Sequence, residues 1–393
     1  MFRFQPISVQ DAFKSLEVLS ELYPPESETV RVNPNLLGRI LAENVVAHSD
    51  IPTVRSSREH GFATMVDYPG ERRRIVGQST ALSPYNAALL PGECVRITIG
   101  GVVPEGADTV VAADDVALTS QEEDSEETVE FEEPGSDARA GDILLTDGFK
   151  LDSVAIGILY EVGFSHVEVY RKSKVCVLSI GDHYGIGTGK EADISRPHLQ
   201  AMFHSQGFTA IDAGSSKEDA GDIEEKLSIA AKFSCVIVTI GSVKSVRKVA
   251  KEMSLTIDIA SVACSPGNFS FAHGNIDEQP VFLCMLSKEL NSAWIGANLF
   301  VSPMLRAMEG RASRDAPRFR AKLTEPVQKS SKTQFLRGRT ERSKSVLTTT
   351  PVSFDALIGF NSIIEVPAGT NLISGSSVDV ILIEISHSAF GFH

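Results

Sequence analysis

The strongest constraint on the fold is an alternation of apolar runs and helical stretches across residues 174–310. Two of the runs, residues 175–180 and 235–240, are of strand length, and each leads directly into a glycine, Gly181 or Gly241. Strands that alternate with helices in this way predict a doubly wound, mostly parallel sheet. Such sheets bind ligands beyond the carboxyl ends of their strands, so we expect a pocket near the two glycines.

Helical and β signals surround this segment. Ser8 opens a pattern that predicts a helix over residues 9–22, and Asn33 and Pro34 predict a second helix over residues 34–46. Residues 54–142 contain short β-like runs separated by Pro-Gly and Gly-Gly turns, and β signals return after Pro317. The chain is therefore expected to be an α/β multidomain protein.

Composition limits the class of protein. The chain has 393 residues and a net charge of −14, which argues against general nucleic-acid binding. It shows no secretory signal and no apolar run of membrane-spanning length, so a cytoplasmic protein without membrane insertion is expected. The five cysteines are scattered without a CxxC pair, which favours reduced thiols over a metal site.

Charge is unevenly distributed along the chain. Residues 122–133 contain eight acidic side chains and no basic one, whereas residues 311–344 contain eleven basic and three acidic ones. Solvated loops explain both stretches, but the basic one is also suited to an acidic or phosphorylated partner segment. RNA binding by residues 311–344 is disfavoured because few aromatic residues interrupt the basic ones.

Four short segments resemble one family. They are LGRILA at residues 37–42, DIP at 50–52, PEGADTVV at 104–111 and QFLRGR at 334–339. They are similar, in this order, to molybdopterin molybdotransferases and the gephyrin E domain. The resemblance implies an elongated molecule of four subdomains: residues 1–50 with 142–172 for dimerisation, 51–141 as a small β insert, 173–311 as a molybdopterin-binding-like α/β domain, and 312–393 as a C-terminal β domain.

The family exchanges the adenylyl group of an adenylylated pterin dithiolene for molybdate, and several of its site positions differ in this chain. His60 lies where the family has an aspartate, and Ile99 replaces a hydroxyl-bearing threonine. The glycine-rich loop at residues 241–249 lacks two glycines and its final aspartate. We interpret these positions as a degenerate active site: His60, Ile99, Asp182, His183, Asp193, Lys244, Val249, Asn268, Lys288 and Glu289. Only Asp182 and Asp193 retain the family's carboxylates.

The resemblance to the gephyrin E domain also implies a peptide groove. Its phenylalanine corresponds to Phe13, its tyrosine to Phe335 and its proline to Pro367, whereas its aspartate corresponds to Gln10. Together with the basic Arg337, these residues predict a homodimeric, non-catalytic scaffold that binds regulatory proteins, without cofactor or metal. Within the family, the chain resembles members that regulate developmental timing.

Two alternatives stay open. The chain can be an active molybdopterin molybdotransferase with an unusual site, which the family segments and Gly241 favour. A new metal centre formed by His60, His183 and His198 is less favoured, because histidines are more often solvated or part of a core.

Overall fold

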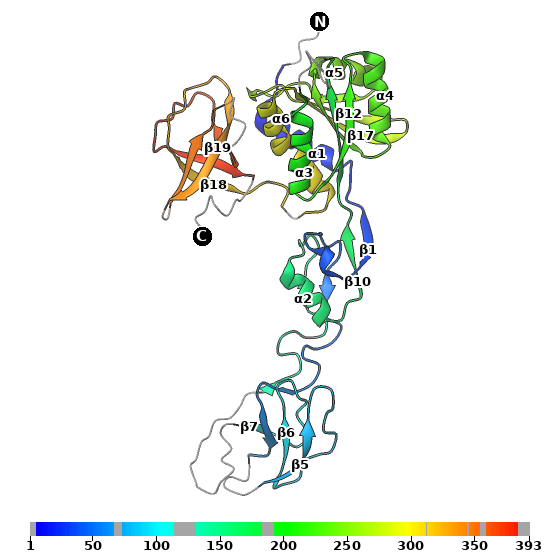
Figure 1. Cartoon of the computed structure of the whole chain (residues 1–393), viewed down its shortest axis with the longest axis vertical. Helices are drawn as coiled ribbons and strands as arrows, with labels where there is room; N and C mark the ends of the chain where they lie inside the picture. The colour runs from blue at the N-terminus through cyan, green and yellow to red at the C-terminus, as the bar shows by residue number, and fades with distance from the viewer. Residues whose placement is uncertain are drawn as a thin grey trace. The chain divides into compact units, whose positions relative to one another are not determined.

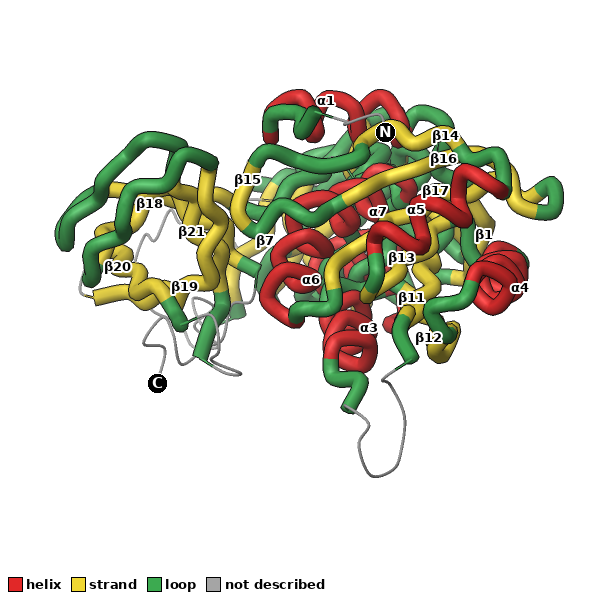
Figure 2. The backbone as a smooth tube through the Cα atoms, turned by 90° about the horizontal axis from the view of Figure 1, so that it is seen from above, coloured by secondary structure: helices red, strands yellow, loops and turns green. Residues whose placement is uncertain are grey.

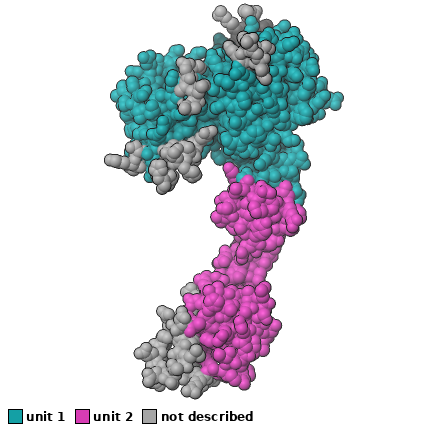
Figure 3. All heavy atoms as spheres, in the orientation of Figure 1, with its two compact units in different colours: residues 1–29, 38–42, 168–393 teal, residues 30–37, 43–167 magenta. Residues whose placement is uncertain are grey.

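The structure is a computed structural model that describes residues 5–66, 73–113, 131–182, 192–311, 313–343, 346–353 and 359–383. The chain forms two compact units (Figure 3). Unit 1 consists of Met1–Thr29, Gly38–Ala42 and Glu168–His393, and unit 2 of Val30–Leu37 and Glu43–Val167. In the described part of the chain, no helix is both long enough and apolar enough to cross a lipid bilayer.

Unit 2 contains a small β domain (Figure 1). Its main sheet has the order β5-β6-β4-β7, formed by β4 (Gly61–Thr64), β5 (Arg74–Ser79), β6 (Glu93–Ile97) and β7 (Thr109–Ala112). Ala63, Val95, Ile97 and Val110 form its core. The remaining elements are η1 (Pro34–Leu36), β2 (Val45–Val46), β3 (Ser56–Ser57), β8 (Phe131–Glu132), β9 (Ile143–Leu145) and α2 (Ser153–Glu161). The mostly β character predicted for residues 54–142 is therefore observed.

The predicted helix over residues 34–46 is wrong. Asn33 caps a turn that begins at Pro34, as predicted, but only the short η1 forms. Gly38 then adopts a φ of 81°, which ends a right-handed helix. Leu41, within the predicted helix, instead pairs with Val169 and is completely buried. Tertiary pairing thus overrides the helical pattern here.

The predicted first helix is confirmed as α1 (Val9–Ser20) of unit 1. The Asp11 N–H donates to the Ser8 Oγ at 3.0 Å, which satisfies one of the free donors at the helix start. Val9, Ala12, Leu16 and Leu19 are buried on one face. After α1, β1 (Ser27–Arg31) pairs with β10 (His166–Tyr170), and both strands include a point where the chain passes between the units.

The predicted doubly wound sheet is confirmed in unit 1, with strand order β12-β11-β13-β17-β16-β14. The first four strands are parallel and the last two antiparallel. Helices lie on both sides of the sheet (Figure 2). The strands are β11 (Lys174–Ile180), β12 (Thr209–Ser216), β13 (Val236–Gly241), β14 (Thr256–Ile259), β16 (Ser270–Ile276) and β17 (Gln279–Ser287).

Alternating side chains of the sheet form two cores. Val177 of β11 packs in a core with α1, α3 (Ser195–Ser205) and α6 (Leu290–Gly296). Leu178 packs on the other face with α4 (Ala220–Ala231) and α5 (Val243–Glu252). A π-helical segment η2 (Ala297–Val301) and α7 (Ser302–Met308) continue from α6 and complete the first core.

The C-terminal part of unit 1 is a small closed barrel. Five strands pair in the order β19-β20-β18-β22-β21, and β21 also pairs with β19, which closes the ring. They are β18 (Arg318–Leu323), β19 (Thr333–Ser343), β20 (Val346–Pro351), β21 (Ser362–Val366) and β22 (Ser377–Leu382). The short β15 (Cys264–Ser265) adds to β19. The C-terminal β character predicted after Pro317 is observed.

Candidate functional site

The order of the parallel strands marks one edge of the sheet as the place where proteins of this fold class bind ligands. β11 lies between β12 and β13. The connection through α3 leads from β11 to β12 on one face, and the connection through α4 leads from β12 to β13 on the other face. Connections that diverge in this way leave an open crevice at the carboxyl ends of the two central strands. We call this region, formed by the residues that follow β11, β12, β13 and β17, the switch-point crevice.

Gly241 is required at this edge for a steric reason. It lies opposite Ile180 in the register of β13 and β11, and its φ is 145°. A Cβ atom at Gly241 would lie 2.0 Å from the Ile180 carbonyl oxygen. Only glycine therefore fits here without displacing the neighbouring strand, so the crevice has bare backbone at this point.

A chain of polar contacts connects three loops at the crevice. The Glu218 N–H donates to the Asp182 carboxylate at 3.0 Å, and the Ser245 hydroxyl donates to the Glu218 carboxylate at 2.6 Å. The hydroxyls of Ser242 and Ser245 are 2.9 Å apart. Sequence reasoning found Asp182 but missed Glu218, Ser242 and Ser245. The only available signal was that Glu218 follows a strand of the same sheet.

Asp193 lies before α3 and is paired with a neighbouring arginine. Arg196 Nε contacts the Asp193 carboxylate at 2.8 Å, and the same guanidinium also pairs with Asp212. Burial opposes ionisation of Asp212, but the Gly214 N–H and Arg196 outweigh it and hold the pKa of Asp212 below its ordinary value. The charge of Asp193 is therefore partly compensated, by a guanidinium that it shares with Asp212. Among the described residues, no group of three His, Cys, Asp or Glu side chains could hold a metal ion.

Lys288 and Glu289 follow β17 and are exposed. The Ser195 hydroxyl, at the start of α3, donates to the Lys288 carbonyl oxygen at 3.1 Å. This bond fixes the loop after β17 against α3, so both side chains lie at the same sheet edge as Asp182. Lys244 lies in the first turn of α5 and is also exposed.

Two other predicted site positions are not part of the crevice. Val249 is 2% exposed and packs in the core beneath α5, two helical turns after Gly241. Asn268 is exposed in the segment after β15. His183 lies outside the described residues.

His60 and Ile99 belong to unit 2. His60 lines a pocket of about 350 Å³ together with Phe62, Ile75, Arg96 and Thr98. Ile99 is 58% exposed and follows the pocket residue Thr98 without lining the pocket itself. These two positions lie in the β4-β6 region.

The residues predicted to bind proteins are divided between surface and core. Phe13 is half-buried, with its ring centroid 5.3 Å from that of Phe300, and it lines a cavity of about 220 Å³. Phe335 is 1% exposed. Arg337 is 3% exposed, stacks on Phe360 at 4.2 Å and donates to the Ser353 carbonyl oxygen at 3.0 Å. Phe335 and Arg337 are therefore buried residues of β19, and Phe335 belongs to the core that contains α1 and α6.

Gln10 and Pro367, the other two predicted groove residues, are exposed. Only these two and the half-buried Phe13 are thus accessible on this chain, so the predicted groove loses its tyrosine equivalent and its basic residue.

The five cysteines are free, and four of them are buried. Burial raises the pKa of Cys176 to about 11 and that of Cys264 to about 12. Because the thiolate is the reactive form, these thiols are unsuited to nucleophilic catalysis.

Known proteins are similar to this chain in sequence. Residues 7–163 match the family model of the MoeA N-terminal region, domains I and II. The chain is 27% identical to the molybdopterin molybdenumtransferase of Staphylococcus epidermidis over 96% of each protein. It is 25% identical to the Haemophilus influenzae protein of the same name over 83% of each.

Solved structures agree on the fold. The molybdopterin biosynthesis MoeA protein from Pyrococcus horikoshii superimposes with a TM-score of 0.83 and 23% sequence identity, covering 97% of this chain and 100% of that one. A second structure of a MoeA protein from this organism gives a TM-score of 0.76 and 20% identity. The fold is therefore the multidomain α/β fold of MoeA, as predicted.

The predicted pseudoenzyme and the predicted non-catalytic scaffold are wrong. The relatives that match nearly the whole chain are named as enzymes, and their names give no support to a scaffold, a peptide groove or a role in developmental timing. The pseudoenzyme prediction failed because it considered each substituted side chain separately. Much of the polar character of the crevice comes from backbone groups and from Glu218, Ser242 and Ser245, which that count omitted.

Proposed function

We propose that this chain belongs to the MoeA family and is a molybdopterin molybdenumtransferase, an enzyme that transfers molybdenum to molybdopterin. The main support is the similarity to curated enzymes of that name over 96% of the chain. We propose the switch-point crevice of unit 1 as the part of this chain that binds the substrates.

The crevice has groups suited to an anionic substrate. The first N–H groups of α5 have no partner within the helix, and they follow the bare backbone of Gly241. Lys244 adds a positive charge in the same turn, and Lys288 adds another after β17. A phosphate-bearing pterin and molybdate are both anions, so the N–H groups and the lysine side chains complement their negative charge. The negative charge of Glu289 repels an anion, and we propose that it limits where the anion binds.

Asp182 is proposed as the main carboxylate of the reaction. One of its oxygens accepts the Glu218 N–H, which orients the side chain while the other oxygen stays available. Unlike Asp193, it has no arginine partner in the described residues. The resemblance implies exchange of an adenylyl group for molybdate. In that exchange, Asp182 is placed to orient a substrate group by accepting its proton or hydrogen bond.

The decisive experiment supplies the purified full chain with adenylylated molybdopterin and molybdate and measures release of AMP. Wild type is expected to release AMP only when molybdate is present. Asp182→Asn keeps the acceptor for the Glu218 N–H but removes the charge, so we expect at least about a tenfold loss of rate. Asp379→Asn, at an exposed barrel position paired with Arg320, is the matched control and should retain the rate. No AMP release by folded wild type would refute the proposed function.

We also propose a homodimer that forms through residues 1–50 and 142–172. Helix α2 in this region is largely apolar, yet only Ala155 and Leu159 of it are buried, while Val154 is 68% and Tyr160 56% exposed. A second copy of the same face would cover these side chains. Light scattering should give twice the 42.4 kDa chain mass. Val154→Glu should shift this toward the monomer, whereas Ile229→Glu, on exposed α4 surface, should not.

A further inference from the structure

Arg196 connects the segment before α3 to the edge strand of the sheet. It lies in the first turn of α3, and its Nε contacts the Asp193 carboxylate at 2.8 Å. The same guanidinium also pairs with Asp212 of β12, the outermost strand on that side of the sheet. A guanidinium presents several N–H donors in one rigid plane, so a single arginine can bind both carboxylates at once. Arg196 therefore joins two segments that lie apart in the sequence.

Backbone groups hold both carboxylates in place. The Arg196 N–H donates to the Asp193 carboxylate at 3.3 Å, and the Gly214 N–H donates to the Asp212 carboxylate at 2.7 Å. The side chains of Asp193 and Arg196 are only 10% and 20% exposed. Charged contacts are stronger where water is largely excluded, and removal of one partner leaves the other charge shielded and unpaired. The orientation of Asp193 therefore depends on Arg196.

The contacts of Arg196 lead to the switch-point crevice through the start of α3. The Ser195 hydroxyl donates to the Lys288 carbonyl oxygen at 3.1 Å, which attaches this end of α3 to the loop after β17. Asp212, in contrast, lies opposite Val177 in the register of β12 and β11, away from the strand ends. Arg196 thus links a carboxylate at the crevice to an anchor within the sheet.

Asp193, Arg196 and Asp212 form a triad with a net charge of −1, since two carboxylates share one guanidinium. A charge beside the crevice acts on an anion such as molybdate over roughly 10 Å at moderate ionic strength. Substitution of Arg196 by a neutral residue makes the triad more negative, whereas substitution of Asp212 by asparagine makes it neutral. The triad therefore affects both the orientation of Asp193 and the electrostatic potential that the substrate meets.

We propose that Arg196 is a positioning residue of the switch-point crevice, an inference that rests on the function proposed above. It holds Asp193 in one orientation at the crevice, while Asp212 anchors the guanidinium and leaves the triad with its net negative charge. An ion pair with a purely structural role would stabilise α3 without changing the kinetic constants of the folded enzyme. The two roles therefore differ in their effects on kcat and on KM for molybdate.

The AMP-release assay on the full chain, at low ionic strength, measures both constants. Arg196→Gln frees the Asp193 carboxylate and should lower kcat by about fivefold. It also makes the triad more negative, so KM for molybdate should rise by about threefold, and added salt should abolish this rise. Arg196→Lys restores the charge but not the planar fork. Its KM should stay within about twofold of wild type, while its kcat stays at least about threefold lower.

Substitution of Asp212 separates charge from orientation. Asp212→Asn keeps an acceptor oxygen for Arg196, so kcat should stay within about twofold of wild type. The triad becomes neutral, and KM for molybdate should fall by about twofold at low ionic strength. In the double variant Arg196→Gln/Asp212→Asn the net charge of the triad returns to that of wild type. Its KM should therefore return to within about twofold of wild type, while its kcat stays low.

Arg311→Gln is the matched control. Arg311 is 14% exposed, pairs with Glu309 at 2.5 Å and donates to the carbonyl oxygen of Gln206 at the other end of α3. The variant thus removes a shielded arginine that also contacts α3, but at the end remote from the crevice. It should lower the thermal stability in the same way as Arg196→Gln and leave kcat and KM within about twofold of wild type.

Thermal unfolding identifies variants that do not fold. If Arg196→Gln is among them, Arg196→Lys carries the test through its kcat. An active wild type together with wild-type kcat in folded Arg196→Gln and Arg196→Lys would overturn this inference alone, as would equal kinetic effects of Arg196→Gln and Arg311→Gln. A KM that the double variant does not restore would also contradict it. No AMP release by folded wild type would refute the proposed function, and this inference with it.

Discussion

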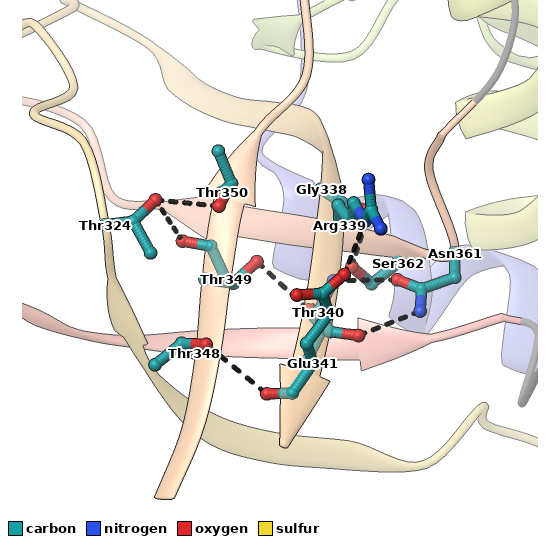
Figure 4. A network of polar contacts seen from close by, with 10 residues as sticks. All are labelled: Thr324, Gly338, Arg339, Thr340, Glu341, Thr348, Thr349, Thr350, Asn361 and Ser362. Carbon is teal, nitrogen blue, oxygen red and sulfur yellow. Dashed lines mark hydrogen bonds and ion pairs between the residues drawn. The ribbon is translucent and has the colours of Figure 1, made fainter. Parts of the chain in front are cut away.

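The interior of the barrel and the switch-point crevice both contain clusters of polar side chains, but the two clusters differ in burial. In the barrel, Thr340, Thr349 and Ser362 are completely buried and Asn361 is 8% exposed. The Thr340 hydroxyl is 3.0 Å from that of Thr349 and 2.8 Å from that of Ser362 (Figure 4). In the crevice, Asp182 is exposed and has bonding capacity left.

Asn361 shows most clearly how the barrel cluster is used. Its side-chain oxygen accepts the Thr340 N–H at 2.8 Å, and its amide nitrogen donates to the Thr340 carbonyl oxygen at 2.9 Å. This side chain thus replaces a missing strand partner. Polar residues that are buried with their bonds made therefore stabilise the fold, whereas polar residues left open at a sheet edge are available to a ligand.

The largest expected effect tests the crevice as a structural element. Gly241→Ala should destabilise the chain by about 4 kcal/mol, because its Cβ meets the Ile180 carbonyl oxygen. Gly214→Ala is the matched control, since Gly214 also has a positive φ, 75°, but free space where the Cβ would be. It should cost about 1 kcal/mol. Urea unfolding measures both. Equal losses would show that backbone conformation, not the close approach of β11, makes glycine necessary.

A somewhat smaller effect is expected in the barrel. Asn361→Ala leaves the N–H and C=O of Thr340 without partners, which should cost about 2–3 kcal/mol. Asn371→Ala, at an exposed position, should change the free energy of unfolding by less than about 0.5 kcal/mol. AMP release per folded molecule should be unchanged in both variants. A large loss of activity in folded Asn361→Ala would contradict the division between structural and functional clusters.

A test of intermediate size concerns the contact between the barrel and the α/β domain. Phe360 makes a T-shaped contact with Trp294 of α6, with 4.9 Å between ring centroids, and it also contacts the Arg337 guanidinium. Phe360→Leu should destabilise the chain by about 1–2 kcal/mol, while Phe319→Leu, at a 43% exposed position, should have little effect. Differential scanning calorimetry gives both values. Identical melting of the two variants would mean that this aromatic contact does not stabilise the junction.

The smallest effect on stability is expected at Asp182. Asp182→Asn keeps its acceptor oxygen for the Glu218 N–H and removes only an exposed charge, so its free energy of unfolding should stay within about 0.5 kcal/mol of wild type. This variant should nevertheless lose the most activity among folded variants in the AMP-release assay. A destabilisation as large as that of Asn361→Ala would place Asp182 with the structural residues.

Most of the fold could be predicted because its signals are local. The Ser8 cap and the apolar stripe specify α1, and the alternation after residue 174 specifies the doubly wound sheet. The predicted helix over residues 34–46 failed because the pairing of Leu41 with Val169 connects distant segments. Arg337 was expected on the surface because it belongs to a basic stretch, yet its stacking partner Phe360 is 23 residues away in the sequence.

Local sequence and tertiary structure also specify different parts of the candidate site. Local sequence was enough to specify the strands, their terminal glycines Gly181 and Gly241, and the carboxylate Asp182 that follows β11. Tertiary structure was needed to show that Glu218, Ser242 and Ser245 join Asp182, and that Arg196 pairs with Asp193. The physical reason is that strand order, set by crossover connections, brings together loops that follow different strands. Periodicity specifies each strand but not which strands become neighbours.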